Sequence, residues 1–147
     1  INIIKSKFNF AFGQHSGVID LSKDKMQLPR FPINEKYGDL DRFKSIINLL
    51  PFYYKNITPK ERYLTDKENP PKILIEFFNE QKNLKNISCY SNEANKWRKS
   101  ETFFKDENNL EILINEKFTT ERGRINCSLN DQGGWRWFGI QFTISKI

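Results

Sequence analysis

The chain has 147 residues, which is enough for one domain or for one small domain with a leading segment. Its 24 basic and 18 acidic residues give a net charge of +6, which favours acidic partners, but the basic residues are scattered and so argue against specific nucleic-acid binding. No apolar run reaches the roughly 18 residues of a membrane span, so none is expected. Because the chain begins at Ile1 without a signal-peptide pattern, we expect a processed product or a fragment.

The N-terminal half predicts one helix between two irregular segments. Residues 1–38 are expected to form an irregular connector, since "LPRFPINEKYG" carries two prolines. Residues 40–50, "LDRFKSIINLL", place apolar side chains at helical spacing, with Asp39 as the N-cap and Pro51 as the stop. The charged, proline-rich tract "KNITPKERYLTDKENPPK" is expected to be a linker, so a connector over residues 1–70 should precede a second domain.

Residues 71–147 predict a domain made of strands. Six short segments with β-type composition are separated by polar turns, namely "KILIEFF", "NISCYS", "WRKSETFF", "NLEILINEKF", "GRINCSL" and "WRWFGIQFTI". This pattern is typical of a mainly β fold, an antiparallel β-sandwich of the immunoglobulin or fibronectin kind.

The last of these segments carries the main candidate for a binding surface. Alternation places one apolar row on the core side, made of Phe138, Ile140, Phe142 and Ile144. The opposite side carries Trp135, Trp137 and Gln141. Two neighbouring indoles would make a platform for sugar rings, and all three residues are therefore glycan-binding candidates. The alternative is a packed interface, which Gly139 favours because a glycine admits another backbone closely.

The remaining candidates are one histidine and two cysteines. His15 is either a structural residue or a general acid or base. Without a second histidine or a hydrolase motif, neither a metal site nor a self-sufficient enzyme is expected in this chain. Cys89 and Cys127 form no CxxC pair, and the residues alone leave open two buried thiols or one disulfide.

Several segments, taken in order from about residue 8 to residue 144, resemble the C-terminal part of bacterial polysaccharide deacetylases of carbohydrate esterase family four. "FAFGQHSG" is similar to the closing strand and loop of their catalytic barrel, and "LPRFPINEKYGDLDRF" to the passage that leaves it. "ISCYS", "RGRINCSL" and "WRWFGIQF" resemble the β-domain that one branch of the family appends.

The resemblance implies that a parent enzyme removes N-acetyl or O-acetyl groups from a polysaccharide, using a divalent metal such as zinc held by an Asp and two His. The sequence segments that carry these metal ligands in the family are absent here. The resemblance therefore places them upstream of Ile1 and implies that this chain alone is inactive. By the resemblance, His15 falls near the histidine that acts as general acid in the last motif of the family, although "FGQHSG" departs from the usual Leu-x-His form of that motif.

As partners, the resemblance implies the upstream catalytic domain and a polysaccharide. It also implies a Cys89–Cys127 disulfide on neighbouring strands and a place in the cell envelope, periplasmic or secreted, with the cytoplasm as the alternative. Two further functions stay open: a stand-alone carbohydrate- or protein-binding module, and a purely structural domain whose tryptophans are covered by residues 1–60.

Overall fold

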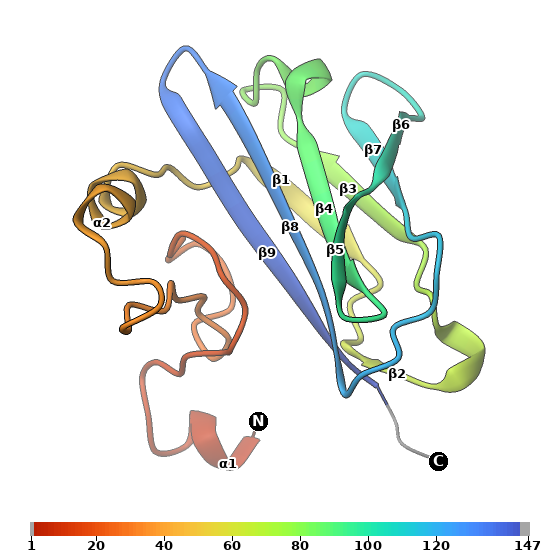
Figure 1. Cartoon of the computed structure of the whole chain (residues 1–147), viewed down its shortest axis with the longest axis horizontal. Coiled ribbons are helices and arrows are strands. Elements are labelled where there is room, and N and C mark those ends of the chain that lie inside the picture. Colours follow the sequence, from red (N-terminus) through yellow and green to blue (C-terminus); the bar gives the residue numbers. More distant parts are fainter. Residues whose placement is uncertain (1, 145–147) are drawn as a thin grey trace.

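The computed structural model describes residues 2–144 and consists mainly of β-strands (Figure 1). The helical elements are α1 (Asn2–Lys5), α2 (Leu40–Ile47) and two single 3₁₀ turns, η1 (Asp66–Glu68) and η2 (Leu84–Asn86). The strands are β1 (Tyr54–Thr58), β2 (Tyr63–Leu64), β3 (Ile73–Phe77), β4 (Ser88–Glu93), β5 (Lys96–Lys99), β6 (Glu101–Phe104), β7 (Asn109–Leu113), β8 (Arg122–Asp131) and β9 (Gly134–Ile144).

The strands form two sheets. One has the order β1-β3-β7-β6 and the other β2-β9-β8-β4-β5. All pairs are antiparallel except β2 and β9, which run parallel and so depart from the purely antiparallel prediction. The predicted strand "WRKSETFF" is divided at the buried Ser100: β5 before it pairs with β4, and β6 after it pairs with β7. One continuous segment therefore serves both sheets.

The hydrophobic core lies between the two sheets. Its members alternate along the strands, as on the inner face of a half-buried strand. The four-stranded sheet contributes Ile57, Ile73, Ile75, Phe77, Leu110 and Ile112. The five-stranded sheet contributes Leu64, Cys89, Ile125, Cys127, Leu129, Phe138, Ile140 and Phe142. The predicted mainly β fold is confirmed, as is the inward row of the last strand, where Ile144 is partly buried against the core.

The tract expected to be a linker contains two strands instead. β1, apart from its first residue Tyr54, and β2 lie within it, and Ile57 and Leu64 are buried in the same core as the strands that follow. Phe52 joins that core as well, so the packed unit begins near residue 52 rather than at residue 71. The sequence did not predict these strands because each short strand has one buried apolar residue within a tract rich in charge and proline.

Helix α2 begins as predicted and ends earlier. The Asp39 side chain accepts hydrogen bonds from the backbone N–H groups of Asp41 and Arg42, which caps the helix. The helix ends at Ile47 instead of near residue 50, because Leu50 pairs as an isolated bridge with Arg136 of β9. α1, near the start of the chain, was not predicted.

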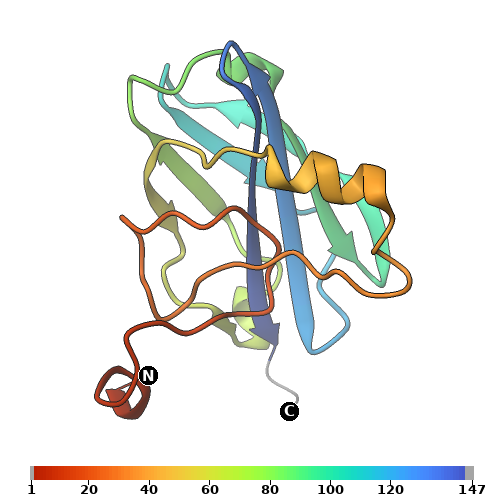
Figure 2. The same cartoon turned by 90° about the vertical axis from the view of Figure 1, so that its left-hand side faces the viewer.

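The segment before residue 52 lies against the outer side of β9, in front of it in Figure 2 and beside it in Figure 1. The Leu50 N–H donates to the Trp135 carbonyl at 2.8 Å, and the Trp137 N–H donates to the Leu50 carbonyl at 3.1 Å. The Phe31 ring meets the Trp137 ring edge-on, with centroids 6.1 Å apart. This segment therefore forms a third, thin layer over the last strand.

Candidate functional site

A pocket of about 180 Å³ lies between this N-terminal layer and β9, and we call it the β9 pocket. Its polar lining is His15, Asp20, Lys23, Asp24, Gln27, Tyr54, Arg62, Trp137 and Gln141. Three of the four predicted catalytic or glycan-binding residues, His15, Trp137 and Gln141, are thus brought together from opposite ends of the chain. Sequence spacing could not reveal this, because it depends on how residues 11–31 lie across the sheet.

The backbone of the N-terminal layer approaches β9 closely at Gly139. A Cβ atom at this position would lie 2.1 Å from the Ser16 carbonyl oxygen, a distance that no side chain tolerates. Gly139 also lies on the pocket wall between Trp137 and Gln141. The close approach expected of this glycine is therefore present, and its partner is the segment that carries His15.

Two buried polar atoms, which belong to residues that line the pocket, have no hydrogen-bond partner among residues 2–144. They are the indole Nε1 of Trp137, which is a donor, and the amide Oε1 of Gln141, which is an acceptor. Buried polar groups in folded proteins are nearly always hydrogen-bonded, so each orphaned atom calls for an explanation. Here the two atoms are of opposite hydrogen-bonding type and belong to two residues of one pocket lining, but protein atoms cover each of them.

The titratable groups of the pocket affect one another. Burial, and then the positive charge of Arg62, lower the pKa of His15 below 6.5, so the imidazole is neutral at pH 7. Burial also raises the pKa of Tyr54 and lowers that of Arg62. A neutral imidazole has one nitrogen that can accept a proton or a hydrogen bond and one N–H that can donate a hydrogen bond.

Trp135 lies outside this pocket, in a second and more open hollow of about 710 Å³, which we call the outer groove. The outer groove is lined by Asn83, Asn86, Ser88, Tyr90, Ser128, Asn130, Asp131, Gln132 and Trp135. The single platform expected of Trp135, Trp137 and Gln141 is therefore divided between two hollows that share no lining residue. Trp135 is 55% exposed, whereas the indole N–H of Trp137 is buried.

A buried ion pair that sequence reasoning missed supports the hairpin that carries Trp135. Arg136 donates to the carboxylate of Asp131 and, at 2.6 Å, to the Pro51 carbonyl; both side chains of the ion pair are less than 10% exposed. Burial alone would raise the pKa of Asp131, but hydrogen bonds from Arg136, Gly133 and Gln81 outweigh it and lower the pKa. The only signal in the sequence was an Asp and an Arg flanking the "QGG" turn, which is also typical of an ordinary hairpin.

Cys89 and Cys127 form a disulfide, so the question that the residues left open is answered. The two cysteines are directly opposite each other on β4 and β8, with Cα atoms 4.1 Å apart, and both are fully buried. The bond links β8 and β4, which are neighbouring inner strands of the five-stranded sheet. It joins the strands that carry Tyr90 and Ser128.

No group of three or more His, Cys, Asp or Glu side chains within residues 2–144 is arranged to hold a metal ion. No helix within the same residues is long and apolar enough to cross a membrane. Comparison of the chain with protein-family models, with curated proteins and with solved structures finds no match in any of the three.

Proposed function

We propose that this protein is a glycan-binding β-domain and that the outer groove holds the glycan. The observation that carries the proposal is the pair of exposed aromatic rings at the groove, Trp135 at 55% and Tyr90 at 44%. Exposed aromatic rings beside polar side chains offer a flat apolar face for the C–H side of a sugar ring. Exposed aromatic side chains that cluster at a groove indicate a binding surface, whereas single exposed aromatic residues scattered over a surface do not.

The rest of the groove lining is suited to sugar hydroxyls. Serine hydroxyls and the amides of asparagine and glutamine both donate and accept hydrogen bonds, as sugar hydroxyls do. Asp131 is the one charged residue in this lining among residues 2–144, and its carboxylate is already engaged by Arg136, Gln81 and Gly133. A neutral polysaccharide is therefore the favoured class of ligand.

The test is a titration with neutral oligosaccharides, with N-acetylated and deacetylated forms compared, followed by calorimetry. Trp135→Ala should weaken binding at least tenfold, because it removes the larger ring of the groove. Trp97→Ala is the matched control: Trp97 is 48% exposed on β5 and lies outside the groove, so affinity should not change. Equal affinity of the wild type and the Trp135→Ala variant would refute the proposal.

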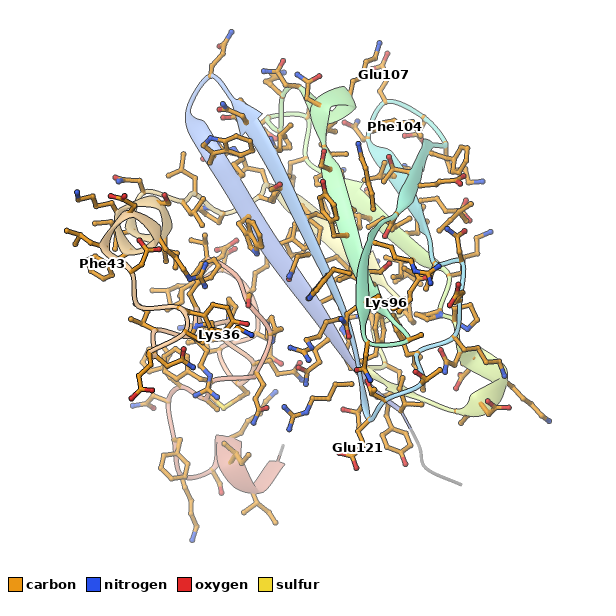
Figure 3. The ribbon with its side chains drawn as sticks, in the orientation of Figure 1. Lys36, Phe43, Lys96, Phe104, Glu107 and Glu121 are labelled. Carbon is orange, nitrogen blue, oxygen red and sulfur yellow. A yellow bond between two sulfur atoms is a disulfide. The ribbon has the colours of Figure 1, made fainter. Side chains whose placement is uncertain are left out.

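A second role is supported by a different observation: the apolar side of α2 is uncovered. Leu40, Phe43 and Ile47 recur at helical spacing and are all exposed, and Phe43 lies on the side of α2 away from the sheets (Figure 3). We infer that residues 2–50 form a docking surface for another folded unit. The upstream catalytic domain of a polysaccharide deacetylase, which the sequence resemblance implies, is our proposal for that unit.

This second role has its own test. The coding sequence upstream of Ile1 should encode the metal-binding Asp and His of a deacetylase, and the longer protein should release acetate from an acetylated glycan in a metal-dependent manner. In that longer protein, α2 should be protected from hydrogen exchange, and Phe43→Asp should remove the protection. An upstream sequence without the metal-binding residues would refute the deacetylase assignment and leave the glycan-binding test untouched.

A further inference from the structure

The outer faces of the two sheets differ in how their charges are balanced. On the four-stranded sheet, Glu76 and Glu111 point outward, because their neighbours along β3 and β7 are core residues. Both carboxylates are paired with lysines. Lys55 forms an ion pair with Glu76, and Glu111 is held by Lys72 and Lys105. The charges on this face are therefore balanced within the protein.

The outer face of the five-stranded sheet carries cations without such partners. The outward positions of β8 include Arg122 and Arg124, and Lys99 of β5 points outward because it lies opposite Tyr90. Within the described strands β4, β5, β8 and β9, no outward position is an Asp or a Glu. None of the three cations forms an ion pair among residues 2–144. We call Arg122, Arg124 and Lys99 the basic face.

The basic face is open and adjoins the outer groove. Tyr90 lines the groove, and its strand partner on β5 is Lys99. Arg124 lies four residues along β8 from Ser128 of the groove, which is roughly 13 Å, and both cations are exposed. In Figure 1, β8, β4 and β5 lie side by side in front of the other sheet, whereas the N-terminal segment lies beside β9. A chain that leaves the groove over β4 and β8 therefore meets these cations.

Charge complementarity identifies the class of ligand. Unpaired cations on an open face attract anions, and the paired N–H donors of an arginine fit a carboxylate. Nucleic-acid binding commonly involves roughly 6–10 phosphate contacts, which three cations do not supply. Between the cations and the groove lie neutral hydrogen-bonding side chains, Asn126 and Ser128. A polymer with many hydroxyls and few negative charges matches this surface.

We propose that the basic face binds the acidic units of a glycan whose neutral units occupy the outer groove. Lys99 and Arg124 form ion pairs with carboxylates of the sugar chain, and Arg122 extends the site to the start of β8. This inference rests on the function proposed for the groove and adds the ligand class, a polysaccharide that contains both neutral and carboxylated sugars. Ion pairs of this kind weaken as the ionic strength rises.

The experiment compares two forms of one oligosaccharide by calorimetry. The probe is a hyaluronan oligosaccharide, which alternates a neutral N-acetylated sugar with a carboxylated one, and its counterpart has the carboxyl groups reduced to alcohols. The carboxylated form should bind about tenfold more tightly at low salt, as three exposed ion pairs of a few-fold each would give. Most of that difference should disappear at about 1 M salt, where the Debye length is about 3 Å. A single-stranded oligonucleotide of equal charge is the third probe.

Two variants test the assigned cations. Lys99→Gln and Arg124→Gln should each weaken binding of the carboxylated form about threefold, and together about tenfold, while binding of the reduced form stays unchanged. Lys55→Gln is the matched control, because it changes the net charge equally but removes a lysine that is paired with Glu76 on the opposite sheet. Its affinity for the carboxylated form should equal that of the wild type.

The outcomes separate this inference from the groove. Equal affinity for the two forms of the oligosaccharide, or an equal loss in Lys55→Gln, would overturn the basic face as a glycan site. Equally tight binding of the oligonucleotide would also overturn it, because the face would then bind any polyanion. A loss in Trp135→Ala without a loss in Lys99→Gln and Arg124→Gln would refute the basic face and leave the groove. The reverse pattern would refute the groove and leave the basic face.

Discussion

Residues 2–50 and residues 51–144 use their hydrophobic side chains in opposite ways. Within the described chain, Leu28 is the one large hydrophobic residue before position 51 that is buried, while twelve there are exposed, whereas 19 hydrophobic residues after that position form the core. The later part therefore carries its own stabilisation, and the earlier part is held mainly by its contacts with β9. Elements with few buried apolar contacts are those that open first, and also those that complete their packing on a partner.

The largest expected effect compares one substitution in the two regions. Phe77 of β3 is fully buried against Phe52, so Phe77→Ala should lower the free energy of unfolding by about 3–5 kcal/mol. Phe43 of α2 is exposed, so Phe43→Ala should change that free energy by no more than about 0.5 kcal/mol. Urea denaturation of both variants measures the contrast. Similar decreases in the free energy of unfolding of the two variants would mean that residues 2–50 contribute to global stability as much as the core does.

The disulfide should be the next largest contributor, and it belongs wholly to the later region. Replacing Cys89 and Cys127 together by alanine reopens a loop of 38 residues, which in the chain-entropy model lowers the free energy of unfolding by ~3–4 kcal/mol. The wild type in a strong reductant is the control and should show the same loss. A double variant with the same free energy of unfolding as the oxidised wild type would show that the disulfide does not stabilise the core.

These two tests bear on the part of the fold that the sequence predicted well. Alternation along "KILIEFF" and "WRWFGIQFTI" predicted both the strands and their inner faces, because a regular two-residue period needs no tertiary information. β1 and β2 were missed since each buries a single residue, Ile57 and Leu64, inside a tract dominated by charge and proline. Local pattern cannot recognise a strand that is fixed by its neighbours.

The sequence predicted which residues belong to the candidate site, but it did not predict how they are arranged. Strand alternation places Trp135 and Trp137 on one face, but it does not show that the Phe31 ring packs against the second indole. In the sequence His15 is distinguished only as the lone histidine, and it lines one pocket with Trp137 because segments about 120 residues apart in the chain cross there. Asp131 and Arg136 gave no signal that separated a buried ion pair from ordinary turn residues.

A smaller effect is expected where the two regions touch. Gly139→Ala would place a methyl group against the Ser16 carbonyl, and since that neighbour is backbone, the N-terminal layer must shift away. Overpacking of this kind lowers stability by roughly 1–3 kcal/mol, and here the loss should be local. Hydrogen exchange should rise at residues 11–17, while the core strands β3 and β7 stay protected. Thr143→Ala, an exposed change on the same strand, is the control, and uniform loss of protection would contradict a separable layer.

The smallest predicted effect is a dependence on pH that arises at His15. Its pKa is lowered in the folded state by burial and by Arg62, so between the folded value and 6.5 the unfolded chain binds more protons than the folded one. The free energy of unfolding of the wild type should therefore fall as the pH drops below about 6.5. The other titratable residues that line the pocket with His15 are Asp20, Lys23, Asp24, Tyr54 and Arg62. Side chains of these four types in an unfolded chain do not titrate between pH 5 and 7.

His15→Gln is the variant that isolates this term, because glutamine keeps a hydrogen-bonding side chain but does not titrate. The wild type should lose stability relative to His15→Gln between pH 7 and pH 5, with the change concentrated in hydrogen exchange of residues 11–31 that form the pocket wall. Carboxylates with a lowered pKa, such as Asp131 and Glu111, also reduce the stability of the protein on acidification, but mainly below about pH 5, which is the lower end of this interval. Parallel pH profiles for the two proteins from pH 7 to pH 5 would show that His15 is solvated in the folded state, and that the N-terminal layer does not close over β9.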